Sequence, residues 1–375
     1  FGSSQLGKDK QGMQKVKLGT VNMWLPSSVM ASIHDEFGVF DMPFIIKNRA
    51  HMNKFNKILV VLFSSLFLSF AANSTEVKFG HVGKPGSLFS ASVDHFAKLA
   101  NERLGSKGKV SVFGSSQLGK DKQGMQKLKL GTVNMWLPSS VMASIHDEFG
   151  VFDMPFIIKN RSHMNKVESQ VLPGMFKNLE DKTGYKVIAV WENGFRHITN
   201  NTRPINTPND LKGIKLRTPK SKWRVKMFQS YGANPTPMSF SEVFTALKTG
   251  TMDGQENPYA QIASAKFQEV QKYLSITGHV YTPAYVTVHK DHWSKLPADV
   301  QSILEQAAQD TQKFVYEEAA KLEKSLLGVI KSAGVQVNEA DKDAFIKASK
   351  GIYDQFASEV PTGGALVDKV SSLAN

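Results

Sequence analysis

The sequence contains no cysteine. Disulfide bridges, catalytic thiolates and cysteine-ligated zinc sites are therefore excluded. Three enzyme signatures are missing as well: the G-x-S-x-G nucleophile elbow, the H-E-x-x-H zinc motif and the phosphate-binding P-loop. These absences argue against a hydrolase or a metalloenzyme, and we expect no catalytic residue, no metal site and no cofactor.

Long basic runs are also absent, although the formal net charge is +13. A segment that binds nucleic acid typically clusters its lysines and arginines, whereas here these residues are scattered along the chain. Scattered positive charge is compatible with an anionic small molecule. We expect no nucleic-acid partner.

One segment occurs twice. Residues 1–54 return as residues 113–166, and the two copies differ only at Val16 against Leu128 and at Ala50 against Ser162. Repeat architectures need several diverged copies in series, and two distant, nearly identical copies do not fit that description. We interpret residues 1–51 as a duplicate of residues 113–163 that arose from a joining error in sequence assembly or gene calling. A recent duplication is the alternative.

The first copy ends at Met52, where a second pattern begins. Lys54 and Lys57 precede the apolar run Ile58–Phe70, and small residues such as Ala72 follow it. A basic start, a short apolar run and small residues at the exit are typical of a secretory signal peptide. The sequence thus predicts a signal peptide over residues 52–75 and a periplasmic protein after it.

The remaining chain alternates strands and helices. Strand patterns at residues 76–83, 109–114 and 133–137 enclose helical patterns, which is the rhythm of a parallel sheet covered by helices. Further strands are predicted at 185–194, 214–219 and 284–290, helices at 259–273 and about 342–356, and a long helical tract at 298–334. Ser221 is predicted to cap one helix, and Ser239 with Glu242 to form a capping box at the start of another. Asp253 and Glu256 are predicted to lie in a loop, as part of a turn and a helix cap. No Pro/Gly or Ser-rich linker divides the chain. Two lobes would therefore be connected by ordinary strands and helices, which is a hinge arrangement.

Arg217 stands at the end of an apolar strand, just before Pro219. Ligands of open α/β sheets lie at the carboxyl ends of strands. A guanidinium group at that place binds a carboxylate through two parallel hydrogen bonds. Periodicity alone, however, favours an ordinary surface arginine at a strand end.

Longer motifs surround Arg217. The segment 213–258 contains Leu-Arg-Thr-Pro, Gly-Ala-Asn-Pro-Thr-Pro-Met-Ser-Phe-Ser-Glu-Val and Asp-Gly-Gln-Glu-Asn-Pro, and "VFDMPFI" and "ENGFRHITNNTRPI" stand upstream. In these motifs the chain resembles the substrate-binding proteins of tripartite ATP-independent periplasmic (TRAP) transporters. The resemblance extends from residue 76 to about residue 333.

The resemblance implies an α/β fold of the two-lobed periplasmic binding protein type, with a hinge and a ligand cleft between the lobes. Lobe I would comprise residues 76–193 and about 284–322, and lobe II residues 194–283 and about 323–375. Arg217 matches the arginine that pairs with the ligand carboxylate, and Arg196 matches a second arginine near it. Asn257 matches a polar ligand contact, and Phe240 an aromatic wall.

Three further residues are predicted to lie at the site with less support from the motifs. Ser139 occupies a position that is glutamate in sialic-acid binders, which argues against sialic acid and for a smaller or different acid. Trp223 lines the pocket or belongs to the core of its helix. His81, at the end of the first strand, faces the cleft or the surface.

The function that the resemblance implies is the capture of an organic acid and its delivery to TRAP membrane permease subunits by a monomeric protein. Two alternatives remain: a carboxylate-binding sensor or scavenger without a permease, and an exported α/β hydrolase. C4-dicarboxylates, 2-oxo or hydroxy acids, sulfonates and sugar acids all present an anion to an arginine, so the sequence leaves the ligand open.

Overall fold

The computed structural model describes residues 74–374. The duplicate at 1–51 and nearly all of the predicted signal peptide lie outside the described residues. Within residues 74–374, no helix has both the length and the apolar character needed to cross a membrane.

Within residues 74–374, nine strands form one sheet in the order β2-β1-β3-β8-β4-β7-β5-β6, with β9 paired to β8. The strands are β1 (Thr75–Gly80), β2 (Gly108–Phe113), β3 (Met135–Trp136), β4 (Tyr185–Asn200), β5 (Lys215–Thr218), β6 (Asn234–Pro237), β7 (Gly254–Asn257), β8 (Tyr273–His289) and β9 (Gln336–Glu339).

The antiparallel pair β4–β8 runs through the whole sheet, from Tyr185 opposite His289 to Asn200 opposite Tyr273. Near one end of this pair, β3 is paired with β8, and β1 and β2 follow β3 as parallel neighbours; we call this the first half of the sheet. At the other end, β7 is paired with β4, β5 and β6 follow β7, and β9 is paired with β8; we call this the second half. The register of β4 and β8 shifts between Glu192 and Gly194, where the two halves meet.

Helices cover the sheet. They are α4 (Leu88–Leu104), α5 (Asp121–Leu130), α6 (Arg161–Gln170), α7 (Leu172–Thr183), α8 (Lys222–Ser230), α9 (Phe240–Lys248), α10 (Tyr259–Ser264), α11 (Lys290–Trp293), α12 (Ala298–Ser332), α13 (Lys342–Ala348), α14 (Lys350–Glu359) and α15 (Gly363–Ser372). Short 3₁₀ turns include η4 (Ser140–Ser144) and η5 (Asp147–Asp153).

Local sequence explains the first of these helices. Ser87 caps α4 by accepting a hydrogen bond from the Ser90 amide at 3.2 Å, and Gly105 ends it with a φ of +55°. The predicted apolar stripe is buried, with Val93 and Phe96 fully inaccessible to solvent. The structure also confirms three further predicted elements: the strand at 109–114 is β2, the strand at 214–219 is β5, and the helical tract from 298 is α12.

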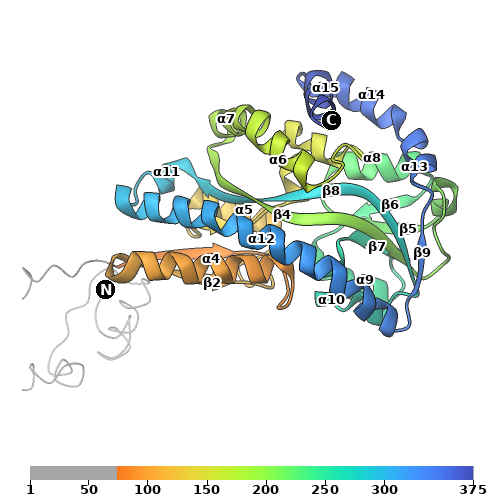
Figure 1. Ribbon diagram of the computed structural model, residues 1–375, viewed down its shortest axis with the longest axis horizontal. Coiled ribbons are helices and arrows are strands. Elements are labelled where there is room, and N and C mark those ends of the chain that lie inside the picture. The colour runs from red at the N-terminus through yellow and green to blue at the C-terminus, as the bar shows by residue number, and fades with distance from the viewer. Residues whose placement is uncertain (1–73, 375) are drawn as a thin grey trace, which may run out of the picture. The chain divides into compact units, whose positions relative to one another are not determined.

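The 35-residue helix α12 connects the two halves. It packs on α4 and β4 in the first half and on α10 in the second (Figure 1). The indole N–H of Trp191, on β4, donates to the carbonyl of Ala308 on α12 at 2.9 Å. The chain therefore passes between the halves in β4, β8 and α12, as the absence of a linker predicts.

Three local predictions were wrong. The helix predicted from Tyr259 to Tyr273 ends at Ser264, because Lys266 takes a left-handed φ of +59°. The segment around Glu256, predicted as a loop, is strand β7. The helix predicted over 342–356 breaks at Ser349, whose hydroxyl donates to the carbonyl of Phe345 at 2.6 Å.

Two predicted helix caps have other partners. The hydroxyl of Ser221 donates to the carboxylate of Asp153 instead of capping α8. At the start of α9, Ser239 makes no side-chain capping bond, and Glu242 forms an ion pair with Lys120 at 2.6 Å. Since Lys120 precedes α5 in the first half and α9 belongs to the second, this ion pair joins the two halves.

The predicted lobe boundaries within α12 and beyond it stay a prediction. Helix α14 contacts the second half where Phe356 packs on Trp223 of α8. Helix α15 and the turn before it contact the first half, since Thr362 donates to Glu148 at 2.8 Å and the carbonyl of Val370 is bonded to His163 at 2.8 Å. The C-terminal helices thus touch both halves.

Candidate functional site

A cavity of about 270 Å³ is lined by residues from both halves of the sheet. From the first half come the loop before α5, the start of α5 and the turn η4. From the second half come the ends of β5 and β7 and the start of α9. Strand β4 passes through the lining at the junction of the halves. The cavity therefore lies where a hinge between the halves would open and close.

Five of the seven predicted site residues line this cavity: Arg196 on β4, Arg217 on β5, Asn257 on β7, Phe240 on α9 and Ser139 before η4. They come from five separate segments, and the sheet brings them together.

Trp223 and His81 do not line the cavity. Trp223 is fully buried and packs edge-on against Phe356, with ring centroids 5.0 Å apart, so it lies in the core beside α14. His81 is also buried, at 1 % exposure, and within residues 74–374 neither ring nitrogen has a hydrogen-bond partner. Burial lowers the pKa of His81 to about 4, which keeps the ring uncharged.

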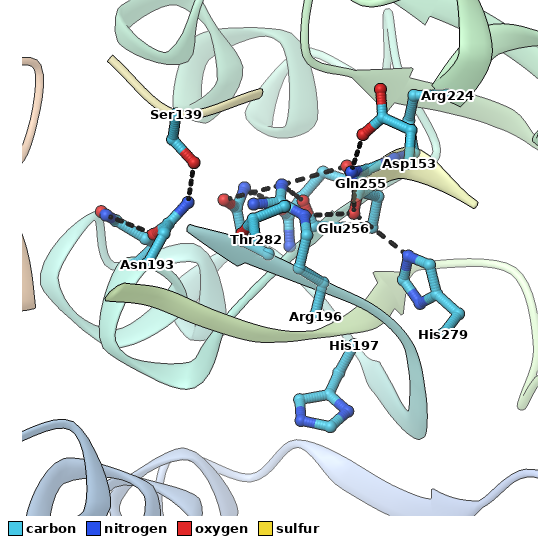
Figure 2. A network of polar contacts seen from close by, with 12 residues as sticks. Ser139, Asp153, Asn193, Arg196, His197, Arg224, Gln255, Glu256, His279 and Thr282 are labelled. Carbon is cyan, nitrogen blue, oxygen red and sulfur yellow. Dashed lines mark hydrogen bonds and ion pairs between the residues drawn. The ribbon is translucent and has the colours of Figure 1, made fainter. Parts of the chain in front are cut away.

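Ser139 is held by the junction of the halves. Its hydroxyl donates to the carbonyl of Pro283 on β8 at 2.7 Å and accepts from the side-chain amide of Asn193 on β4 at 3.2 Å (Figure 2). Asn193 in turn accepts from the amide of Gln261 at 3.2 Å. These hydrogen bonds link the residue before η4 to β4 and α10 along the cavity wall.

A buried ion cluster lies behind the arginine side of the cavity (Figure 2). Glu256 accepts from Arg196 Nε at 2.5 Å and from Arg224 Nη1 at 2.7 Å. Arg224 Nη2 also donates to Asp153 at 2.5 Å. His279 Nε2 lies 3.1 Å from the same Glu256 oxygen that binds both arginines. Each of these side chains is at most 3 % exposed.

The cluster fixes the charge of its members. Burial alone would raise the pKa of Glu256, but the positive charges of Arg196 and Arg224 outweigh it and hold this pKa well below its usual range. Burial lowers the pKa of His279 despite its contact with Glu256, so the ring is neutral at physiological pH. Arg196 also donates to Asn257 Oδ1 at 3.0 Å, and Asn257 Nδ2 donates to Gln255 Oε1 at 2.5 Å, so both ends of that amide are held in place.

Arg217 differs from the other two buried arginines. Its Nε and Nη2 donate to the carbonyl of Met238 at 3.0 and 2.7 Å, and within residues 74–374 it has no carboxylate partner. It is only 3 % exposed. Burial lowers its pKa to about 9, because withdrawal from water disfavours the charged form. The cavity wall thus holds a buried guanidinium group whose charge nothing in the described chain neutralises directly.

Sequence reasoning missed the cluster behind the site. Glu256 was predicted to be part of a turn or a helix cap, and this is wrong because it lies fully buried in β7. Asp153 and Arg224 were not singled out. The motifs "VFDMPFI" and "DGQENP" contain Asp153 and Glu256, so the signal was present, but no spacing rule relates residues this far apart.

The chain matches the family described as "DctP: Bacterial extracellular solute-binding protein, family 7" over residues 1–75 and 79–359. It is 33% identical over 327 residues to the 2,3-diketo-L-gulonate-binding periplasmic protein YiaO of Escherichia coli K12, covering 85% of this chain and 99% of that protein.

Two solved structures of TRAP periplasmic solute-binding proteins are also similar. One, from Polaromonas sp. JS666 and bound to D-erythronate, is 32% identical with a TM-score of 0.76, covering 80% of this chain and 99% of the other. The second, from Sulfurospirillum deleyianum with bound succinate, is 33% identical with a TM-score of 0.76 and the same coverage of 80% and 99%. The α/β fold with one sheet and a cavity between its halves is the one these proteins share. The chain belongs to the DctP family of bacterial extracellular solute-binding proteins.

Proposed function

We propose that this protein captures an organic acid outside the cytoplasm and delivers it to the membrane permease of a TRAP transporter. One observation carries the proposal: Arg217 is a buried guanidinium group in a cavity wall with no carboxylate partner among the described residues. A carboxylate from a ligand supplies the missing negative charge and accepts two parallel hydrogen bonds.

The charge of the neighbouring cluster supports the same reading. Arg196 and Arg224 form ion pairs with Glu256 and Asp153, whereas Arg217 has no carboxylate within ion-pair distance among the described residues. The family relatives described above bind acids, namely D-erythronate, succinate and 2,3-diketo-L-gulonate. We propose Arg217 as the anchor, Arg196 and Asn257 as its orienting neighbours, and Phe240 and Ser139 as walls of the same site.

The remaining parts of the proposal concern export, oligomeric state and catalysis. We propose that a signal peptide starting at Met52 exports the chain to the periplasm, and that the exported protein works as a monomer. We further propose that it binds its ligand without converting it.

Binding of an acid is expected to raise the melting temperature of the full chain. A ligand that binds only the folded state adds roughly 2.7 kcal/mol of stability at a hundredfold excess over Kd. The measurement is a thermal-shift screen of organic acids, with erythritol as the uncharged partner of erythronate. Equal shifts from an acid and its neutral polyol would contradict the role of Arg217.

We also expect the protein to close around its ligand. The cavity takes its lining from both halves of the sheet, so a ligand that touches both binds the closed form better and shifts the population toward it. Small-angle X-ray scattering should show a smaller radius of gyration at saturation with ligand. An unchanged scattering profile at saturation would rule out closure.

A further inference from the structure

We infer that the ligand is a monocarboxylate carrying hydroxyl groups, and that Asp121 together with Ser140 and Gln261 recognises those hydroxyls. The inference rests on the proposed function, because it assumes that the carboxylate lies at Arg217. It goes further in naming the chemical class of the rest of the ligand.

The two walls of the cavity differ in charge. The wall from β4 and β5 presents the guanidinium groups of Arg196 and Arg217. The wall from the first half presents the carboxylate of Asp121, the first residue of α5. Its Oδ1 accepts from the Trp136 indole N–H at 3.4 Å, and no other hydrogen bond to this carboxylate occurs within residues 74–374. A carboxylate with spare lone pairs accepts hydrogen bonds from hydroxyl groups and repels a second carboxylate.

Two residues of the lining each carry a buried polar atom without a partner. Within residues 74–374, Ser140 Oγ and Gln261 Oε1 are buried and make no hydrogen bond. Gln261 is 4 % exposed, and its amide nitrogen is already used by Asn193. Buried polar groups are normally satisfied, and an unmet one costs about 1–3 kcal/mol. An amide oxygen needs a donor, which a ligand hydroxyl provides and an ionised carboxylate does not.

The lysines around the cavity do not cancel the negative charge that Asp121 places on its wall. Lys120 is paired with Glu242 at 2.6 Å, and Lys122 and Lys220 are exposed side chains. Enclosure by the protein raises the pKa of Asp121 to about 6. The hydrogen bond from Trp136 and the positive charges of Arg217 and Lys220 act in the opposite direction and limit this rise. The carboxylate is therefore ionised above this pH and poorly hydrated, which favours hydrogen bonds from a ligand.

The size of the cavity sets the length of the ligand. Its volume of about 270 Å³ lies just below the roughly 300 to 1,000 Å³ of sites for drug-sized ligands. Acids of about four to six carbons fit this space. The test therefore uses two chain lengths.

The experiment is isothermal titration calorimetry of the full chain at pH 7.5 with two sets of four acids. Erythronate, meso-tartrate, butyrate and succinate combine presence or absence of hydroxyls with one or two carboxylates at four carbons. Gluconate, glucarate, hexanoate and adipate do the same at six. We expect the hydroxylated monocarboxylate to bind at least ~10-fold more tightly than the other three acids of its set, for at least one chain length.

The variant Asp121→Asn is expected to reduce the preference for the monocarboxylate over its dicarboxylate partner by ~10-fold, because the repelling charge is removed while the size is kept. Asp354→Asn, at an exposed position on α14, is the matched control and should leave the preference unchanged. The readout is a ratio measured on one preparation, so partial misfolding of a variant does not affect it.

A dicarboxylate, or an acid without hydroxyls, that binds as tightly as the hydroxylated monocarboxylate would overturn the inference and leave the proposed function intact. An unchanged preference in Asp121→Asn would remove Asp121 from it. Binding of none of the eight acids would overturn the proposed function, and the inference with it.

Discussion

Replacing Arg217 with lysine is expected to weaken binding of the cognate acid by about tenfold or more while the fold is kept. The guanidinium of Arg217 bonds the Met238 carbonyl through Nε and Nη2, and its planar fork still offers N–H groups to the cavity. An ammonium group is a point charge on a flexible stem and does not reproduce this double arrangement. Calorimetric titration of the variant and the wild type measures the effect.

The matched control is Arg103→Lys. Arg103 is a half-exposed arginine that pairs with Asp310 at 2.7 Å on the surface, away from the cavity lining. This exchange should leave the affinity as it is, because exposed ion pairs contribute roughly 0–1 kcal/mol and this pair does not touch the ligand. If Arg217→Lys binds as tightly as the control, Arg217 is not the anchor.

Glu256→Gln is expected to lower the free energy of unfolding by roughly 3–5 kcal/mol. The carboxylate of Glu256 neutralises Arg196 and Arg224 at once, and all three side chains are almost completely buried. Glutamine removes the negative charge and turns an N–H donor toward two cations, which leaves both guanidinium groups buried without a full counter-charge. Urea denaturation with linear extrapolation measures the change.

The exposed pair Lys226–Glu359 provides the control, because Glu359→Gln removes a carboxylate that water already solvates and should leave the free energy of unfolding nearly unchanged.

The effect of Glu256 also depends on pH. Its pKa in the folded protein lies below the usual 4.5, so its stabilising contribution is complete above pH 4.5 and is lost as the pH falls below that value. The stability difference between wild type and Glu256→Gln should therefore shrink in acid. A difference that does not change with pH would mean that the Glu256 charge is not what stabilises the cluster.

The sequence was sufficient to name five of the residues that line the cavity, because most of them lie in contiguous motifs. Arg217, Asn257 and Phe240 lie in long motifs whose order is specific, so the resemblance identified them although periodicity did not. The ion cluster was missed because Asp153, Arg224 and Glu256 meet only when the sheet forms. Side-chain spacing along a chain carries no information on such contacts.

One error of element type and one question that the sequence left open have a similar origin. Strand β7, with the sequence Gly-Gln-Glu-Asn, has none of the β-branched or aromatic residues that indicate a strand, and its polar side chains are stabilised by partners on β4 and α8. The sequence indicated that one side of α8 is apolar. It did not show whether Trp223 faces the cavity or the core, because Trp223 packs on α14, which lies much later in the sequence.

The connection between the two halves has a consequence for survival outside the cytoplasm. Proteases cut exposed, flexible segments, and a linker between two moving bodies is usually such a segment. In this protein the halves are connected by β4 and β8, which are hydrogen-bonded to each other along their length, and by the single helix α12. Within residues 74–374, the closure proposed above therefore requires no exposed linker in β4, β8 or α12 that proteases could cut.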